Sequence, residues 1–163
     1  GDFVRGVKAS VTIPVIVTGD IPTADHAADA LDRSGADGVM IGRGAYGRPW
    51  VLAQVARFLT TGERPAEPSL AEQKAILQKH YALMLDCHGT NPGLRLARKH
   101  VAWYSKGLPG SAEFRAAVNR LDDPEAVLAL VDAFLDPLIE RGVARAGAET
   151  LPPEPGEGER MAA

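Results

Sequence analysis

PVIVTGD (residues 14–20) and GVMIGR (residues 38–43) are two short apolar runs, and each ends at a glycine followed by a charged residue. Such runs, rich in Val and Ile and bounded by turn residues, predict β-strands. The segment between them, residues 23–34, has the spacing of one helix, which Thr23 can cap and Gly35 can end. The order of these segments predicts a parallel βαβ unit with a glycine turn at the carboxyl end of each strand.

The position of these turns predicts a ligand site. Ligands of α/β folds bind at the carboxyl ends of the strands, and the last two βα loops of a (β/α)₈ barrel often bind phosphate. Both predicted strands are apolar throughout, as in a parallel sheet that is covered on both faces. Pro49 opens a further predicted helix over residues 50–59, with these residues facing inward: Val51, Leu52, Val55, Phe58 and Leu59. We therefore expect residues 1–61 to be the last two βα units of a TIM barrel whose other strands are not in this chain.

The pattern changes to helices alone after residue 61. Residues 62–68 contain two prolines and predict a linker. Four segments with helical spacing follow, and a turn is expected over residues 89–93; the segments begin at Ser69, Leu94, Ser111 and Asp123. We expect residues 69–141 to form a four-helix-bundle domain, so the fold class is α/β plus all-α. Residues 142–163 consist largely of Gly, Pro, Glu and Ala, which predicts a disordered tail.

Composition and charge exclude several classes. The chain has 163 residues, a net charge of −3 and 45% hydrophobic residues, so it is an ordinary globular chain without a global preference for polyanions. No apolar run approaches the roughly 20 residues of a membrane span, and no signal peptide opens the chain. Because Cys87 is the single cysteine, an internal disulfide is impossible, which suggests a cytoplasmic location. The first residues resemble the tail of a helix already under way and lack an initiator Met, so we expect a fragment of a longer protein.

The two glycine turns favour an anion. Gly19 and Gly42 would let backbone N–H groups approach a phosphate closely, and Arg43 could add a charged contact. The alternative is that both glycines merely allow sharp turns. A carboxylate repels phosphate, so we expect Asp20 to turn away and bond backbone amides, or to cap the next helix. The sequence shows no metal-ligand spacing among its histidines and no Ser-His-Asp or Cys-His set.

A second group of candidate residues is basic. Residues 87–112 contain Arg and Lys but no Asp or Glu, and the candidate RNA-binding residues are Arg95, Arg98, Lys99 and His100. A helix face of this kind suits a phosphodiester backbone. The alternative is that these cations neutralise the carboxylates of residues 113–140. Trp103 and Tyr104 are expected in the core.

These motifs together resemble a known family. The segments that carry the likeness are IPVIVTGDI (13–21), GADGVMIGRG (35–44), GRPW (47–50), ARKH (97–100) and the pair Trp103-Tyr104. They look like the carboxyl-terminal portion of a bacterial tRNA-dihydrouridine synthase of the B-type, once described as nitrogen-regulation-like. The similarity covers residues 5–140 without a large gap.

The resemblance implies a flavin enzyme that modifies tRNA. Such enzymes hold FMN in a barrel, reduce it with NADPH, and transfer hydride to C6 of a uridine while a cysteine protonates C5; a helical domain grips the tRNA. By match of motif the FMN-phosphate contacts would be Thr18, Gly19, Asp20, Gly42 and Arg43, and the tRNA-facing residues would be Arg95, Arg98, Lys99 and His100. The family usually has Asn at the position of Thr18. Cys87 does not match the catalytic cysteine, so we expect the isolated chain to be inactive.

Two other functions remain open at this point. The helices could form a free-standing RNA-binding module, with the βαβ unit as a remnant. The chain could also come from a different FMN barrel oxidoreductase of the dihydroorotate dehydrogenase kind.

Overall fold

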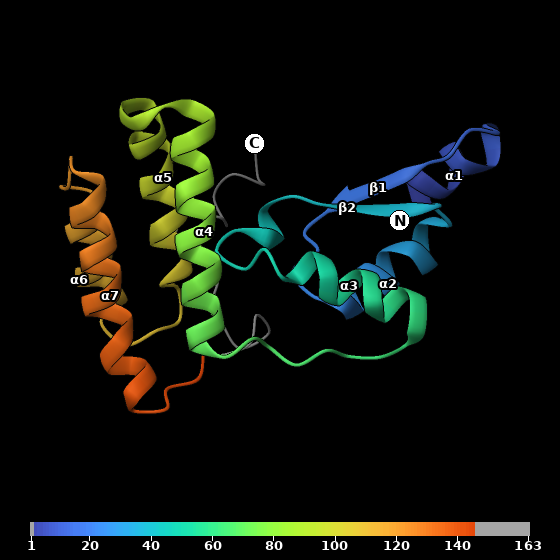
Figure 1. Cartoon of the computed structure of the whole chain (residues 1–163). Coiled ribbons are helices and arrows are strands. Elements are labelled where there is room, and N and C mark those ends of the chain that lie inside the picture. Colours follow the sequence, from blue (N-terminus) through green and yellow to red (C-terminus); the bar gives the residue numbers. More distant parts are fainter. Residues whose placement is uncertain (1, 146–163) are drawn as a thin grey trace.

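A computed structural model describes residues 2–145 of the chain, which form two lobes (Figure 1). The first lobe holds a two-stranded sheet with helices, and the second lobe holds helices only. The elements in chain order are α1 (Asp2–Ser10), β1 (Ile16–Gly19), α2 (Ala24–Ser34), β2 (Gly38–Ile41), the short 3-10 helix η1 (Arg43–Ala45), α3 (Val51–Thr61), α4 (Leu70–His88), α5 (Thr90–Tyr104), α6 (Ser111–Val118) and α7 (Pro124–Glu140). The chain passes between the lobes along residues 62–69, and the turn after β2 also reaches the second lobe.

The predicted βαβ unit is confirmed. β1 and β2 pair in parallel, with Gly19 opposite Ile41, and α2 connects them and packs against both strands. The Thr23 hydroxyl caps α2 by accepting from the His26 N–H, and Gly35, with φ 65°, ends the helix. The core of this lobe is small and consists of Ile21, Ala27, Val51 and Val55, with further residues such as Val39 against it.

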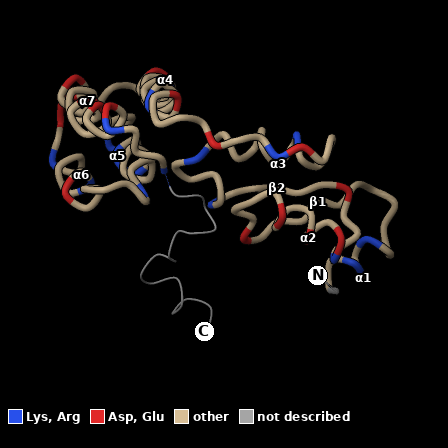
Figure 2. Tube along the Cα trace, turned by 90° about the horizontal axis from the view of Figure 1, so that it is seen from below, with Lys and Arg blue, Asp and Glu red and all other residues tan. Residues whose placement is uncertain are grey.

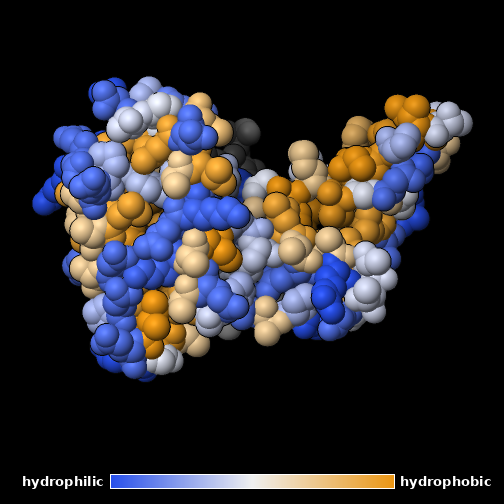
Figure 3. All heavy atoms as spheres, in the orientation of Figure 1, coloured by the Kyte–Doolittle hydropathy of each residue, from blue (hydrophilic) through white to orange (hydrophobic). Residues whose placement is uncertain are grey.

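Only one face of the sheet is covered, so the prediction of cover on both faces is wrong for the described residues. Side chains alternate between faces along a strand, and α2 lies on one side of the sheet. On the other side Ile16 and Met40 are 56% and 55% exposed. In Figure 3 an apolar surface gathers over the region of α1, β1 and β2. Leu52 and Leu59 of α3 are exposed too, contrary to expectation, because the helix buries only its Val51 and Val55 side.

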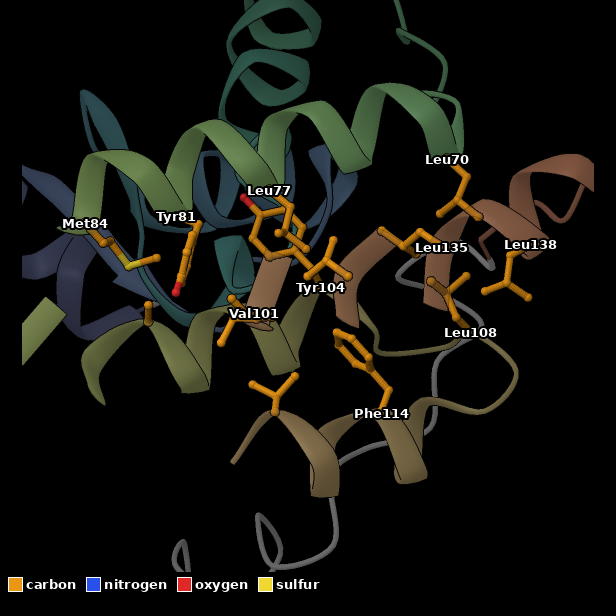
Figure 4. Packing of buried hydrophobic residues seen from close by; sticks show 14 of the residues in the cluster. Leu70, Leu77, Tyr81, Met84, Val101, Tyr104, Leu108, Phe114, Leu135 and Leu138 are labelled. Carbon is orange, nitrogen blue, oxygen red and sulfur yellow. The ribbon is translucent and has the colours of Figure 1, made fainter. Parts of the chain in front are cut away.

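The four helices of the second lobe share one hydrophobic core (Figure 4). α4 packs along α5 and α7, and α6 contacts α5 and α7. Tyr81 and Val101 from the α4–α5 pair are each 1% exposed, and Val131 of α7 is fully buried. Burial of a large apolar side chain contributes about 1.5–3 kcal/mol, so this core is the main source of stability in the lobe.

The helix ends follow local sequence signals in part. Ser69 and Glu72 form the predicted capping box of α4, and the Asp123 carboxylate caps α7 by accepting from the Ala126 N–H at 2.9 Å. Two boundaries differ from the prediction: Ser111 is the first residue of α6 rather than its cap, and α5 begins at Thr90 without a longer turn. Gly89 alone, with φ 77°, reverses the chain before α5.

The predicted disordered tail is wrong for its first residues. Val143 packs against the helical core, and Arg145 is only 7% exposed. The composition of the segment did not predict this burial, because the segment contains no apolar stretch and is held mainly by the buried Arg145. The rest of the predicted tail, residues 146–163, lies outside the described residues.

Candidate functional site

The two glycine turns lie side by side at one edge of the sheet. Gly19 is the last residue of β1 and pairs with Ile41, the last residue of β2. Because the strands are parallel, Thr18–Asp20 and Gly42–Arg43 emerge from the same edge. The sequence therefore predicted correctly that these residues come together.

The glycines at this edge differ in what surrounds them. A Cβ at Gly19 or Gly42 would have no neighbour within 4 Å among the described residues, and neither residue has a positive φ. A Cβ at Gly44 would instead overlap the backbone of Ile21 and Pro22. Gly44 is thus needed for packing between the two loops, whereas Gly19 and Gly42 leave their backbone open to an external group.

Asp20 and Arg43 form an ion pair across the two turns. The Arg43 guanidinium donates to the Asp20 carboxylate at 3.0 Å, and both side chains are exposed. The expectation that Asp20 bonds backbone amides or caps α2 is wrong, because Thr23 supplies the cap. The carboxylate offsets the charge of Arg43, so an anion at this edge competes with Asp20 for the guanidinium.

Thr18 connects the two strands. Its hydroxyl donates to the Met40 carbonyl at 3.2 Å and lies on the uncovered face of the sheet. A shallow pocket of about 340 Å³ adjoins this strand end, lined by Thr18, Gly19 and Asp20 on one side and by α2 residues such as Arg33 on the other. Arg33 is paired with Asp29 at 2.9 Å.

The basic helix of the sequence is α5, which contains Arg95, Arg98 and Lys99 and no Asp or Glu. Figure 2 shows where Lys and Arg positions lie in this lobe. Arg95 and Lys99 are exposed, and within residues 2–145 neither side chain makes a hydrogen bond or ion pair. The two residues lie one turn apart on the same face of the helix. This face therefore presents two uncompensated positive charges to solvent.

Arg98 differs from its two neighbours because its side chain is used in packing. Its guanidinium donates to the Leu121 carbonyl at 2.7 Å and to the Asp122 carboxylate at 2.5 Å, and the side chain is 23% exposed. For this residue the alternative of neutralising a neighbouring carboxylate describes the structure. Arg98 ties α5 to the turn between α6 and α7.

His100 belongs to an aromatic cluster, which consists of Tyr46, His80, His100, Trp103 and Tyr104. The Tyr46 and Trp103 rings are stacked with centroids 4.0 Å apart, and the His80 and His100 rings meet edge to face at 5.2 Å. Burial lowers the pKa of both histidines, and the His80 charge lowers that of His100 further. Both imidazoles are therefore neutral at pH 7. The expectation that Trp103 and Tyr104 are both core residues holds for Tyr104, at 5% exposure, while Trp103 is half-buried.

Sequence reasoning missed the residues that join the two lobes. We define the joint as Gly47, Trp103, Tyr104 and Arg145. The Arg145 guanidinium donates to the carbonyls of all three other residues, at 3.0 Å to Gly47, 3.2 Å to Tyr104 and 3.3 Å to Trp103. Burial, with the nearby charge of Arg48, lowers its pKa to about 10, so it stays charged at pH 7. The GRPW motif could have indicated Gly47, but nothing in the sequence indicated Arg145.

Other classes of site find little support in the described residues. Residues 2–145 contain no group of three or more His, Cys, Asp or Glu that could hold a metal ion. Cys87 is exposed near the end of α4. None of the described helices has the length and apolar character needed to cross a membrane.

Comparison with known proteins shows the family. The family model for dihydrouridine synthase matches residues 2–139. A probable tRNA-dihydrouridine synthase of Rickettsia conorii is 52% identical over 139 residues, which cover 85% of this chain and 42% of the relative. The tRNA-dihydrouridine synthase B of Xanthomonas axonopodis pv. citri is 48% identical over 133 residues, 82% of this chain and 40% of the relative. The chain thus spans about two fifths of the length of these curated relatives. With a match that runs through both glycine turns and α5, the chain belongs to the dihydrouridine synthase family.

Proposed function

We propose that this chain is part of an enzyme that reduces a uridine of tRNA to 5,6-dihydrouridine with FMN and NADPH. The observation that carries the proposal is the family match, which includes the sheet edge of the first lobe and the basic helix of the second. In this proposal residues 1–61 are the last two βα units of a TIM barrel, and residues 69–141 are a four-helix tRNA-binding domain. The other two functions considered above are not favoured, because neither accounts for both parts of the match.

The residues of the sheet edge fit the phosphate of FMN. Gly19 and Gly42 leave open space at their Cβ positions, so a phosphate oxygen can approach their backbone N–H groups closely. Arg43 would provide a cation, and Thr18 and Asp20 would complete the edge. When bound, reduced FMN supplies the hydride for C6 of the uridine. The residues of this chain hold the phosphate end of the cofactor and orient it.

The exposed face of α5 fits the tRNA backbone. Arg95 and Lys99 are the cations we place against phosphates, because they are exposed and have no partner in residues 2–145. Arg98 and His100 stabilise α5 beneath this face: Arg98 donates to Asp122, and the His100 ring contacts Trp103 of the aromatic cluster. We do not assign a catalytic residue to this chain, since Cys87 lies near the end of α4 in the helical lobe and does not match the catalytic cysteine of the family.

Binding of tRNA by the 163-residue chain tests the nucleic-acid part of the proposal. The double variant Arg95→Ala/Lys99→Ala is expected to bind more weakly and with a smaller salt dependence, since each phosphate contact contributes roughly 0.7–0.9 to the slope of log K against log salt. Arg33→Ala/Arg57→Ala removes the same charge from the first lobe and is the matched control. Equal affinity and slope in both double variants would contradict the role of α5.

The cofactor part is tested by adding FMN or riboflavin to ¹⁵N-labelled chain. Only FMN carries a phosphate, so FMN alone is expected to shift the amide signals of Gly19 and Gly42. The variant Gly19→Ala should reduce the shift at Gly42, whereas Gly6→Ala, at another open position on α1, should leave it unchanged. Identical shifts with FMN and riboflavin would exclude a phosphate site at this edge.

A further inference from the structure

Tyr46 stands at the exposed end of the aromatic cluster. Its ring lies flat on the indole of Trp103, with an interplanar angle of 5°, and the His100 ring meets it at 6.4 Å with an interplanar angle of 68°. Nevertheless 48% of the residue is exposed. Trp103 therefore fixes one face of the phenol ring, and the remaining surface forms a rigid apolar platform.

This platform continues the basic face of α5. Arg95, Lys99 and Trp103 follow one another at intervals of four residues, so they lie along one side of the helix. Leu96, 42% exposed, lies beside them. No Asp or Glu occurs from residue 87 to residue 112. A row of positive charges thus leads directly to the stacked rings.

The platform also adjoins the edge of the sheet. Tyr46 follows η1 directly, and its N–H donates to the Arg43 carbonyl at 3.0 Å. The turn that carries it is the one that reaches from the first lobe to the second in Figure 1. Tyr46 therefore lies between the glycine turns and α5.

We propose that the Tyr46 ring, supported by Trp103, stacks an unpaired nucleobase of bound RNA while Arg95 and Lys99 contact phosphates of the same strand. The inference rests on the proposed function and adds a base-binding residue to it. Single-stranded nucleic acids are held by this combination of a cationic track and aromatic rings on which bases stack. A paired A-form helix offers its backbone and groove edges rather than a free base face, so the platform selects a loop or an unstacked nucleotide.

The test compares two labelled probes on the full chain. One probe is a short oligouridylate, and the other is an abasic oligomer with the same number of phosphates. Tyr46→Leu removes the ring but keeps an apolar cover on Trp103, and it is expected to weaken oligouridylate binding roughly 5- to 150-fold while leaving the abasic probe unaffected. Tyr46→Phe keeps the ring and should bind like the unaltered chain. Arg95→Ala/Lys99→Ala should weaken the binding of both probes.

The outcomes separate this inference from the proposed function. If Tyr46→Leu weakens both probes equally, or neither, while Arg95→Ala/Lys99→Ala weakens both, the stacking role is wrong and the RNA-binding role of α5 stands. If the unaltered chain binds neither the probes nor tRNA, both proposals fail.

A second measurement needs no substitution. An oligonucleotide with 5-iodouridine cross-links under ultraviolet light to an aromatic side chain stacked on the base. Mass spectrometry of the cross-linked peptide should identify Tyr46. Cross-links that fall only on other residues would overturn the inference.

Discussion

Position 47 has no room for a side chain. Gly47 has φ 68°, and a Cβ there would overlap the Trp103 carbonyl on the far side of the joint. We expect Gly47→Ala to lower the free energy of unfolding by more than the roughly 1–2 kcal/mol that a left-handed conformation costs by itself. The excess arises because α5 must move away from the turn. Urea denaturation followed by circular dichroism measures the loss.

Gly62 provides the control for this prediction. Gly62 also has a positive φ, 74°, but a Cβ there would meet nothing within 4 Å among the described residues. Gly62→Ala should therefore lower the free energy of unfolding only by the cost of the left-handed backbone conformation. Equal losses in the two variants would contradict a packing role for Gly47.

Single residues differ in how far their roles can be predicted from the sequence. Gly19 and Gly42 could be predicted at strand ends because the apolar runs before them are local signals. Gly47 and Arg145 could not be given their roles, since each is defined by carbonyl groups of Trp103 and Tyr104 that only the folded chain brings near.

At the scale of one helix, α5 has a structural side and an open side. Removing the guanidinium in Arg98→Ala leaves the Leu121 carbonyl and the Asp122 carboxylate without their donor. Hydrogen bonds to charged groups contribute roughly 1.5–3 kcal/mol, so we expect a loss of stability toward the lower end for this half-buried side chain. Arg95→Ala, on the open side, should change stability by less than about 0.5 kcal/mol. Thermal unfolding of the two variants compares them directly, and equal midpoints would contradict this division.

The same helix shows which features the helical spacing of the sequence can predict and which it cannot. Helical spacing correctly placed Arg95 and Lys99 on one stripe, and the caps at Ser69 and Asp123 were readable because each cap bonds a residue three positions away. The sequence could place the partner of Arg98 only among the carboxylates of residues 113–140, since Asp122 comes to α5 through the turn between α6 and α7. Which acidic and basic residues pair between helices depends on how the helices pack, and the spacing within one helix does not describe that packing.

For the whole molecule we expect stability to fall as the pH drops below about 6.5. Burial lowers the pKa of His80 and His100 in the folded chain below the value of 6.5 that the unfolded chain keeps. Below that value the unfolded state binds more protons, and the loss continues until the folded pKa values are reached. Each unit of pKa difference corresponds to about 1.4 kcal/mol. Denaturation midpoints measured between pH 5 and pH 8 give the profile.

The double variant His80→Gln/His100→Gln is the control for this profile. It should have a flatter dependence on pH between 5 and 7. Asp25, Asp37 and Glu72 have lowered pKa values through hydrogen bonds from Arg64, Lys8 and Ser69, so their contribution disappears only at more acidic pH. An unchanged slope in the double variant would exclude the histidine pair as its cause.

At this scale the sequence separated a βαβ part from a helical part. The structure has two cores, and Trp50, which the sequence assigned to the first part, lies in the core of the helical lobe. The open face of the sheet was not predictable, because apolar strands look the same whether or not other strands cover them. The contact between the lobes was equally hidden, since it depends on one turn, one helix end and Arg145.

The position of Arg145 has a consequence for how the molecule can be shortened. A chain cut after Arg141, where the helical pattern ends, keeps every described helix. It loses Val143 from the helical core and the guanidinium that donates to the carbonyls of Gly47, Trp103 and Tyr104. Three carbonyl groups would then lose their shared donor, and the lobes would be joined only by their remaining contacts in residues 2–141, such as the Tyr46–Trp103 stack and Trp50 in the helical core. A short segment beyond the last described helix thus helps to fix the position of the sheet edge relative to the basic helix α5, although it belongs to neither.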